Sequence, residues 1–248
     1  MKKRPVKVLC QGCGQEVETV SLGSLTRRYC DDCAEVKAMK DEMDRLAREE
    51  AYIEAKYREM VADAKMPKKW QPVTFANSDP NLNEVAFQIA RNYAESFNIE
   101  SRTLVLYSSG FGCGKTHLAA CIANHVLHEL RRPVIFEKAR DLLLNIRRTF
   151  SDPDNSEADI LDQVLPVDLM VLDDVGLDKP SNWVESTYWT IFDRRLESGL
   201  PMVVTTNYAI EPELTQEGLA DRIGYGAMSR LMQMCNGEFI DLTGPDLR

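Results

Sequence analysis

The chain has 248 residues, of which 44% are hydrophobic and 28% are charged, and its formal net charge is −9. This length suits one α/β domain plus a small module, and the acidic balance argues against a general polyanion binder. No apolar stretch approaches the length of a membrane span, and no hydrophobic signal region follows the basic start, so we expect a cytoplasmic protein with no membrane partner.

Two Cys-x-x-Cys pairs stand near the N-terminus, Cys10 with Cys13 and Cys30 with Cys33. Seven cysteines in a chain of this kind favour metal ligands or free thiols over disulfides. Four thiolates at this spacing can close a tetrahedron around Zn²⁺, and so short a segment needs the metal for much of its stability. A redox role is the alternative, but it needs one low-pKa pair and not two matched pairs. We therefore predict a zinc module with four cysteine ligands over residues 1–33.

The charge of this module differs from that of the rest of the chain. Residues 1–33 hold six basic and four acidic residues, whereas residues 34–248 hold 24 basic and 35 acidic residues. We expect the acidic part to bind other proteins and to touch nucleic acid only locally. The module could instead bind single-stranded DNA, but Tyr29 is its only aromatic residue and offers little for bases to stack on.

A long helix is predicted over residues 34–66. Gly and Pro are absent from Ala34 to Lys65, and Pro67 follows. Apolar residues recur at steps of three and four, a heptad pattern of about four repeats that Glu50 interrupts. The residues of this stripe are Val36, Met39, Met43, Leu46, Ile53, Tyr57, Met60 and Ala64. A narrow apolar stripe on a charged helix needs a partner, which could be a second copy, the rest of this chain or a helix of another protein.

The larger domain is expected over residues 67–248. Its opening segment is Trp70–Phe75, and Asn81–Phe97 has the pattern of a helix. Further along, Arg132–Lys138 contains a strand and Ala139–Phe150 forms a helix. Strands that alternate with helices are typical of an α/β fold with a parallel sheet.

The segment after the apolar run Leu104–Leu106 has the composition of a phosphate-binding loop. Glycines let the backbone wrap closely, so that successive N–H groups point at phosphate oxygens. Lys115 adds a charge for the β- and γ-phosphates, the Thr116 hydroxyl is placed to ligate Mg²⁺, and a following helix presents its N-terminus to the anion. The nucleotide-binding residues predicted here are Gly110, Phe111, Gly112, Cys113, Gly114, Lys115, Thr116 and His117.

One position of this loop departs from the strict pattern, because Ser109 stands where that pattern has glycine. Serine can make the turn only if φ there is negative or the strain is tolerated. The alternative is a glycine-rich turn with no ligand, but it does not explain the Gly-Lys-Thr triplet. We therefore predict that the loop binds ATP or ADP and that Lys115 also acts in catalysis.

The apolar run Val167–Gly176 carries two acidic residues near its end, Asp173 and Asp174. Such a run is typical of a central parallel strand, whose C-terminal end faces the crevice where α/β sheets bind ligands. We predict that Thr116 and Asp173 hold Mg²⁺ and that Asp174 orients or deprotonates the attacking water. Because Asp is one methylene shorter than Glu, hydrolysis could be slow. The alternative is a strand that ends in a solvated acidic turn.

A third strand is predicted over Met202–Asn207, and it ends in polar residues. Asn207 at the edge of the sheet is a candidate catalytic residue that contacts the γ-phosphate or the lytic water. The alternative is an asparagine in a β-turn before Tyr208.

The order of phosphate loop, acidic strand and polar-ended strand resembles that of AAA+ ATPases. In finer detail, roughly residues 70–248 resemble the DnaC/DnaI-type helicase loaders and the related IstB-type transposition helpers. The matching stretches are Gly112–Ala119, Leu169–Gly176, Thr205–Asn207, Met228–Leu231 and Thr243–Arg248. The resemblance implies an α/β fold, an AAA+ P-loop ATPase core with a parallel sheet. It also implies no separate lid domain, for which a chain that stops at Arg248 leaves no room.

The same resemblance implies a residue that acts between subunits. In that family, an arginine of a Ser-Arg-Leu motif reaches into the ATP site of the neighbouring subunit, and Arg230 is the match here. ATP would then join copies of the chain in a ring or spiral. Arg222 is a second candidate, and a structural ion pair is the alternative for either arginine.

The resemblance also implies contacts with DNA and with a helicase. The helix at residues 139–150 corresponds to one that lines the DNA-facing side of initiator assemblies, where Arg140, Arg147 and Arg148 would contact phosphates. A solvated helix face is the alternative for these arginines. Residues 1–66 are expected to hold the replicative hexameric helicase.

The predicted function is therefore that of an ATPase that binds the replicative DNA helicase and delivers it to single-stranded DNA during replication initiation. Its cofactors would be ATP or ADP, Mg²⁺ and Zn²⁺. Three alternatives stay open: an IstB-type transposition helper, a nucleotide-gated adaptor with little hydrolysis, and a zinc-dependent nucleic-acid binder that does not use ATP.

Overall fold

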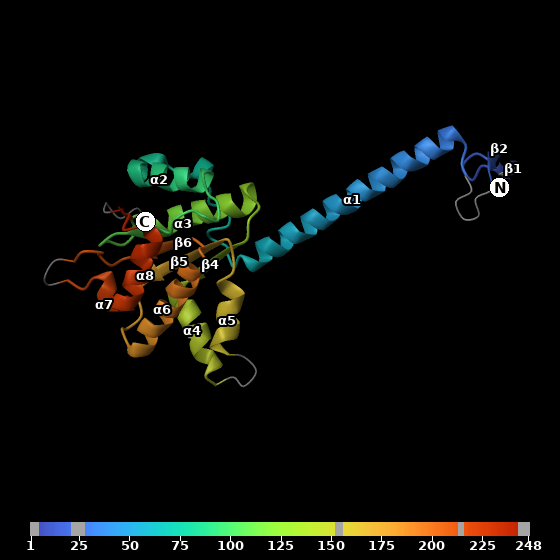
Figure 1. Ribbon diagram of the computed structural model, residues 1–248. Helices are drawn as coiled ribbons and strands as arrows, with labels where there is room; N and C mark the ends of the chain where they lie inside the picture. The colour runs from blue at the N-terminus through green and yellow to red at the C-terminus, as the bar shows by residue number, and fades with distance from the viewer. Residues whose placement is uncertain (1–4, 21–27, 152–155, 213–215, 243–248) are drawn as a thin grey trace. The chain divides into compact units, whose positions relative to one another are not determined.

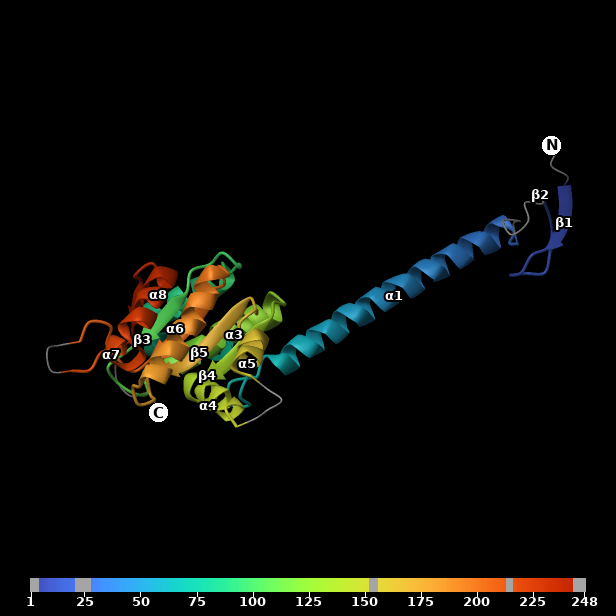
Figure 2. The ribbon, with the colours of Figure 1, turned by 60° about the horizontal axis from the view of Figure 1, so that its bottom comes forward.

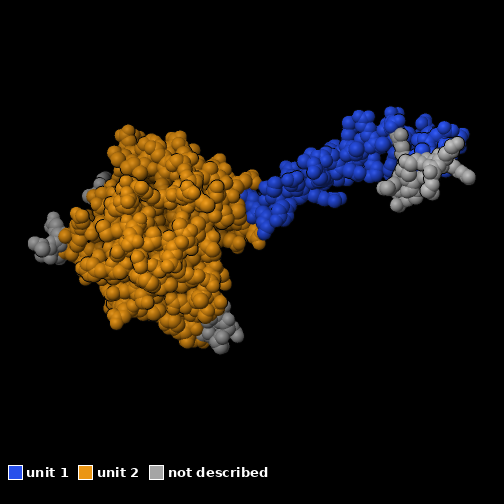
Figure 3. Space-filling view, viewed as in Figure 1, with its two compact units in different colours: residues 1–58 blue, residues 59–248 orange. Residues whose placement is uncertain are grey.

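The computed structural model describes residues 5–20, 28–151, 156–212 and 216–242. The chain forms two compact units, residues 1–58 and residues 59–248 (Figure 3). Within the described ranges, no helix is both long enough and apolar enough to cross a membrane.

The first unit begins with a hairpin. Strand β1 (Pro5–Leu9) pairs antiparallel with β2 (Glu16–Val20), so that Val8 lies opposite Val17. Gly14 lies between the strands with a φ of 77°, a conformation that glycine adopts without strain. The sequence did not predict this hairpin, because each strand offers only five residues of alternating burial, too few to show a clear pattern.

Helix α1 (Asp31–Asp63) is the long helix that the heptad pattern predicted. Asp31 and Asp32 occupy its first turn, where negative charge interacts favourably with the helix dipole. Cys33 therefore lies inside the helix. The helix ends two residues before Lys65, whose left-handed φ of 51° stops it.

The apolar stripe of α1 falls into two parts. In the first unit most of its side chains are exposed, for example Val36 at 66% and Met43 at 70%, and Tyr57 is half-buried. In the second unit, Met60 packs against a core cluster that contains the buried Ala64 and Met66. Only the end of the stripe is therefore covered by residues of its own unit.

The second unit is built on a five-stranded sheet with the order β4–β5–β6–β3–β7, in which every pair is parallel. This confirms the predicted fold class. The sheet consists of β3 (Leu104–Tyr107), β4 (Val134–Lys138), β5 (Leu169–Val175), β6 (Met202–Thr206) and β7 (Phe239–Asp241). Strand β7 was not predicted, because three residues cannot show a strand pattern by themselves.

Helices cover both faces of this sheet (Figure 1). One face carries α2 (Glu84–Glu95) and α3 (Lys115–Asn124), which continues into a π-helical turn (His125–Glu129). The view in Figure 2 brings the other face forward. It carries α4 (Ala139–Thr149), α5 (Glu157–Val164), α6 (Asn182–Glu197), α7 (Leu219–Ile223) and α8 (Tyr225–Cys235).

The strands place successive side chains on opposite faces of the sheet. In β5, Leu169 and Val171 pack on the side of α2 and α3, whereas Met170 and Leu172 pack on the side of α4 to α8. All four side chains are fully buried. A strand buried on both faces is what an uninterrupted apolar run predicts.

The helix predicted over Asn81–Phe97 is shorter than expected at both ends. A 3-10 turn, Pro80–Leu82, forms first, and a similar turn, Phe75–Asn77, precedes it. The Asn83 side chain then accepts a hydrogen bond from the Ala86 N–H and caps α2. A cap of this kind determines where the helix begins. In the sequence, a polar cap residue cannot be told apart from the other polar residues near it, so the start of the helix was predicted too early.

The helices after β6 belong to the main body. Leu219 of α7 and Leu231 of α8 are fully buried in the core that also contains α4 to α6. Among the described residues of the second unit, these helices pack on the sheet and form no separate domain.

Candidate functional site

The phosphate loop runs from the end of β3 to the start of α3. Gly112 and Gly114 have φ values of 77° and 88°, the left-handed region that favours glycine. Ser109 is exposed and does not have a positive φ, so serine makes this turn without strain. Helix α3 begins at Lys115, directly after Gly114 of the loop. Helix N-termini placed in this way bind phosphate through free backbone N–H groups.

Lys115 is the first residue of α3, and only 5% of it is exposed. Its Nζ donates to Ser108 Oγ at 2.6 Å and to the Gly110 carbonyl at 3.0 Å. Ser108 is fully buried and donates to the same carbonyl at 2.7 Å. The loop thus holds the ammonium group in place before any phosphate is bound. The sequence did not single out Ser108, because serine is common at the ends of strands.

Thr116 and Asp173 come together from α3 and β5. Thr116 Oγ1 and Thr205 Oγ1 both donate to Asp173 Oδ1, at 2.8 Å and 2.7 Å. Asp173 is 1% exposed, and burial raises the pKa of its carboxyl, although the Thr205 hydrogen bond lowers that pKa. A divalent cation would offset the cost of this buried charge. The hydroxyl and the carboxylate are oxygen ligands of the kind Mg²⁺ prefers, so the pair fits that ion.

Asp174 occupies a bulge in β5. The register of β5 against β6 shifts between Leu172 and Val175, and Asp174 has a left-handed φ of 58°. Its backbone N–H donates to Thr205 Oγ1 at 2.9 Å, and Asn207 Nδ2 donates to its Oδ1 at 3.1 Å. A strained backbone held by surrounding hydrogen bonds is common at functional sites. The structure therefore brings the two predicted catalytic residues, Asp174 and Asn207, into contact.

A cavity of about 750 Å³ connects these parts. Phe111 to His117 line it, together with Asp174 and Asn207. Gly110 and Asp173 do not line it, but they bond to Lys115 and Thr116, which do. This volume is typical of sites for small molecules and cofactors.

The same cavity has a second group of lining residues, which the sequence did not reveal. They are Lys69, Trp70, Asn77, Ser78, Asp79, Asn83 and Phe87. His117 Nε2 lies 2.6 Å from Ser78 Oγ, and its ring packs edge-on to Trp70 with centroids 6.1 Å apart. Burial, and then the charge of Lys69, lower the pKa of His117. An aromatic and amide-rich wall suits a nucleobase better than a phosphate.

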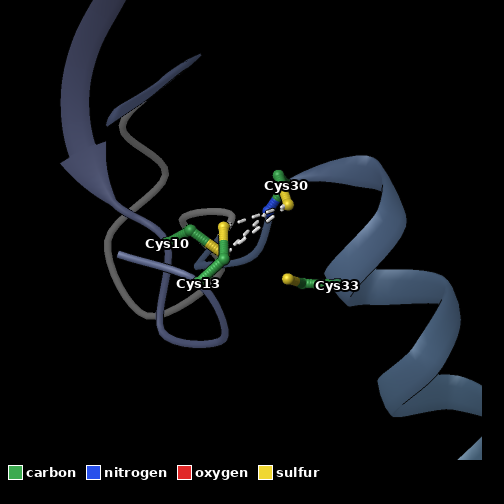
Figure 4. A group of neighbouring side chains, drawn as sticks. All are labelled: Cys10, Cys13, Cys30 and Cys33. Atoms are coloured by element: carbon green, nitrogen blue, oxygen red, sulfur yellow. Dashed lines mark hydrogen bonds between the residues drawn. The ribbon is translucent and has the colours of Figure 1, made fainter. Parts of the chain in front are cut away.

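The four cysteines of the first unit point toward one another (Figure 4). Their sulfur atoms all lie within 4.8 Å of one another, and Cys10 and Cys13 each place Sγ 3.7 Å from Cys30 Sγ. Metal–sulfur bonds of about 2.3 Å in a tetrahedron give sulfur–sulfur edges of about 3.8 Å. The cluster of Cys10, Cys13, Cys30 and Cys33 can therefore hold zinc.

Backbone groups favour the thiolate form of Cys10, whereas hydrogen bonds with the neighbouring thiols raise the pKa of Cys33 to about 12. The N–H groups of Gly12 and Cys30 lie 3.4 Å and 3.3 Å from Cys10 Sγ. Backbone hydrogen bonds, of which that from Cys30 is the strongest, lower the pKa of Cys10 to about 6. A Cβ at Gly12 would lie 2.7 Å from Cys33 Sγ, so only glycine fits beside the sulfur atoms.

The two candidate arginines are held differently. Arg222 Nε donates to the Gly176 carbonyl at 2.8 Å, and its terminal nitrogens contact the Asp178 carbonyl at 2.6 Å and Glu217 Oε2 at 3.1 Å. Arg222 therefore holds the backbone of the segment after β5 in place through two carbonyl groups. Arg230 makes one ion pair, with Asp193. Neither arginine lines the cavity of its own chain.

The three arginines of α4 are exposed. The Arg147 guanidinium lies 4.6 Å from the centre of the Trp183 ring, and Arg148 donates to Asn145 Oδ1 at 3.2 Å. Arg140 lies on the same helix. These side chains are accessible, and their contact with DNA stays a prediction. The predicted stretch at residues 243–248 lies outside the described residues.

Comparisons with known proteins agree with this geometry. The profile of the IstB-like ATP binding protein family matches residues 25–235. The "Replicative helicase loader DnaC" of Escherichia coli (strain K12) is 34% identical over 145 residues, which are 57% of this chain and 58% of that protein. Its namesake from Buchnera aphidicola subsp. Schizaphis graminum is 30% identical over 144 residues, or 57% and 55%. The chain thus spans little more than half the length of these relatives.

Solved structures share the fold. A "DnaC helicase loader" crystal structure superposes with a TM-score of 0.61 at 22% identity, covering 71% of this chain and 99% of that one. The DnaI crystal structure gives 0.56 at 23%, covering 74% and 95%. AMPPCP-bound DnaA from Aquifex aeolicus gives 0.56 at 18%, covering 71% and 50%. At these identities the likeness establishes that the second unit shares the fold of these proteins, an α/β fold with a parallel sheet, as the sequence predicted.

Proposed function

The chain belongs to the family of IstB-like ATP binding proteins, and from this premise we propose that it is an AAA+ ATPase that loads a replicative hexameric helicase onto single-stranded DNA. The main support is one cavity whose walls carry both a phosphate loop and the Asp174–Asn207 pair. The curated relatives named as replicative helicase loaders support the choice of partner.

In the proposed reaction, the phosphate loop and the amino end of α3 bind the phosphates of ATP. Lys115 exchanges its contact with the Gly110 carbonyl for the β- and γ-phosphates. Thr116 and Asp173 would hold Mg²⁺, which supplies positive charge to the phosphate oxygens. Asp174 orients the attacking water, and Asn207 fixes Asp174 through the 3.1 Å hydrogen bond.

A second copy completes the proposed site. Arg230 would reach the γ-phosphate bound by a neighbouring copy, where an arginine stabilises the charge that develops in the transition state. ATP would then promote a ring or spiral of copies. Arg222 is the weaker candidate because its three nitrogens already contact the Gly176 and Asp178 carbonyls and Glu217.

The regions outside the cavity have proposed partners as well. We assign residues 1–33 to a zinc module, residues 34–66 to a partner-binding helix and residues 67–248 to the ATPase. The exposed stripe of α1, with Leu46 at 52% and Ile53 at 50%, offers apolar area to the helicase. Exposed Arg140, Arg147 and Arg148 on α4 would contact DNA phosphates.

One specific observation favours a second candidate function. The family that matches residues 25–235 is that of the IstB-like proteins, so the same ATPase could deliver a transposase to target DNA. In that case the exposed stripe of α1 would bind the transposase in place of a helicase.

The first test is complex formation with the replicative helicase of the host, with and without ATP, followed by light scattering. We expect a complex of defined mass that is lost when residues 1–58 are removed. This cut keeps Ala64 and Met66, which are buried in the second unit. Leu46→Asp should weaken the complex, whereas Arg48→Asp, outside the apolar stripe, should not.

A loader, as distinct from an adaptor, should also hydrolyse ATP at a rate that rises with single-stranded DNA. No complex with the helicase, together with a complex with a transposase, would replace the loader by the transposition helper. A complex with the helicase but no turnover in the presence of DNA would indicate an adaptor.

A further inference from the structure

The surface around Arg230 is formed by α6 and α8. Trp189 and Asp193 lie one turn apart on α6, and Gly226 and Arg230 lie one turn apart on α8. A Cβ at Gly226 would lie 3.2 Å from Trp189 Cδ1. The missing side chain therefore lets the two helices approach, and the next turn places Arg230 beside Asp193.

Arg230 is held at one nitrogen of its guanidinium, Nε. Its Nε is buried and lies 2.7 Å from Asp193 Oδ1, although the N–H is not aligned with that oxygen, so the contact is an ion pair. Its guanidinium carbon lies 5.8 Å from the centre of the Trp189 ring. Among the described residues its two terminal nitrogens have no partner, and unlike Nε they are not buried.

This geometry leaves the part of the side chain that recognises phosphate available. A guanidinium grips phosphate oxygens with its planar fork of N–H groups, and fixing Nε removes rotamer freedom before binding. The side chain of Arg230 is 34% exposed, whereas that of Asp193 is 16% exposed. Asp193 therefore contacts Arg230 at Nε and leaves its terminal nitrogens accessible.

The surrounding surface has the composition of a protein interface. Trp189, whose ring centre lies 5.8 Å from the Arg230 guanidinium carbon, is 41% exposed, and tryptophan and arginine are enriched at such interfaces. An exposed tryptophan beside an arginine whose terminal nitrogens are available suits a second copy of this chain.

We propose that Asp193 is a positioning residue for Arg230: it fixes Nε so that the terminal nitrogens project toward the γ-phosphate bound by a second copy. This inference rests on the proposed role of Arg230 between copies. Asp193 and Arg230 do not line the cavity of their own chain, so Asp193 acts on turnover and not on the binding of ATP to its own copy.

The first measurement is ATP turnover by the full chain with single-stranded DNA. Asp193→Asn keeps the shape of the side chain but removes its charge, and we expect kcat to fall about tenfold with KM for ATP unchanged. Asp193→Glu should recover part of the rate. Asp162→Asn is the matched control, because Asp162 pairs with Arg194 of the same helix and should leave turnover unchanged.

The decisive measurement mixes two inactive chains. Arg230→Ala keeps an ATP site but lacks the arginine, and Lys115→Ala keeps the arginine but lacks a working site. Together they should regain turnover in mixed assemblies. When the Lys115→Ala chain also carries Asp193→Asn, we expect the regained rate to be about tenfold lower.

The outcomes separate the two claims. No regained turnover in the first mixture, with or without the helicase, would overturn the role of Arg230 between copies and the inference with it. Regained turnover that Asp193→Asn leaves unchanged would overturn the inference alone. A faster rate with Asp193→Asn would also overturn it, because the aspartate would then restrain the arginine and not position it.

Discussion

The two units of this chain are stabilised in different ways. In the second unit, a parallel sheet is buried between two apolar clusters, and whole strands such as β5 have almost no exposed surface. Among the described residues of the first unit, Cys10 is the only buried residue of apolar type. A two-stranded hairpin and one helix cannot bury enough surface to be stable alone. We therefore expect the first unit to depend on metal binding by its four cysteines, whereas the second unit is stabilised by its apolar core.

Removal of zinc should produce the largest change and should affect only the first unit. Structural zinc contributes about 10–16 kcal/mol of apparent binding free energy in small domains. We expect a chelator, or Cys30→Ser, to abolish protection of the β1–β2 backbone from hydrogen exchange and to abolish helicase binding. ATP binding by the second unit should persist. Unchanged protection after chelation would contradict a zinc-dependent unit; Cys235→Ala is the matched control outside the cluster.

Replacement of one buried arginine should lower the free energy of unfolding of the second unit instead. Arg195 is fully buried and donates to the carbonyls of Leu165, Val167 and Pro201, and burial lowers its pKa to about 10. Arg195→Met would leave three carbonyl groups without that donor, and we expect urea unfolding to show a loss of about 3–5 kcal/mol. Arg194→Met, at the half-exposed neighbouring position, should cost less than about 1 kcal/mol. Equal losses would contradict the structural role of Arg195.

A substitution in the site should change turnover and leave both units folded. Thr205 Oγ1 donates to Asp173 and accepts the backbone N–H of Asp174, so one hydroxyl holds both acids. Thr205→Val keeps the shape but removes both hydrogen bonds. We expect about a tenfold lower kcat, which corresponds to about 1.4 kcal/mol. Thr187→Val, at a buried threonine outside the site, should keep kcat; a Thr205→Val enzyme with normal kcat would remove Thr205 from the site.

Mild acid should have the smallest effect, and it should act on the second unit. Burial and Lys69 lower the pKa of His117 below its value in the unfolded chain, about 6.5. Below that pH the unfolded chain binds a proton that the folded chain does not, so stability falls as pH falls from about 7 through 6. Thermal unfolding between pH 7.5 and pH 5.5 should show a decrease that His117→Gln reduces and His128→Gln does not. An equal decrease in all three proteins would exclude His117 as its source.

The parts of the fold that the sequence predicted share one property. Strands β3, β5 and β6 are continuous apolar runs, and α1 and α4 have helical periodicity, so each pattern lies within a few residues. The hairpin and β7 were missed because they are short, and α2 was predicted too long because caps are indistinguishable from other polar residues. Helix α6, in the segment between β5 and β6, was not predicted from the sequence. Its aromatic residues Tyr188 and Phe192 are buried in the core.

The sequence by itself determined the chemistry of both sites. The order of glycines, Lys115 and Thr116 specifies a phosphate loop, and the two Cys-x-x-Cys pairs specify a tetrahedral cluster, because these functions need particular residues at short, fixed spacing. Only the tertiary structure decided which distant residues support them. Thr205 reaches Asp173 across 32 residues, and Ser78 reaches His117 across 39. Such contacts depend on which elements become neighbours in the fold. The packing of helices on the two faces of the sheet determines those neighbours, and the local sequence does not show it.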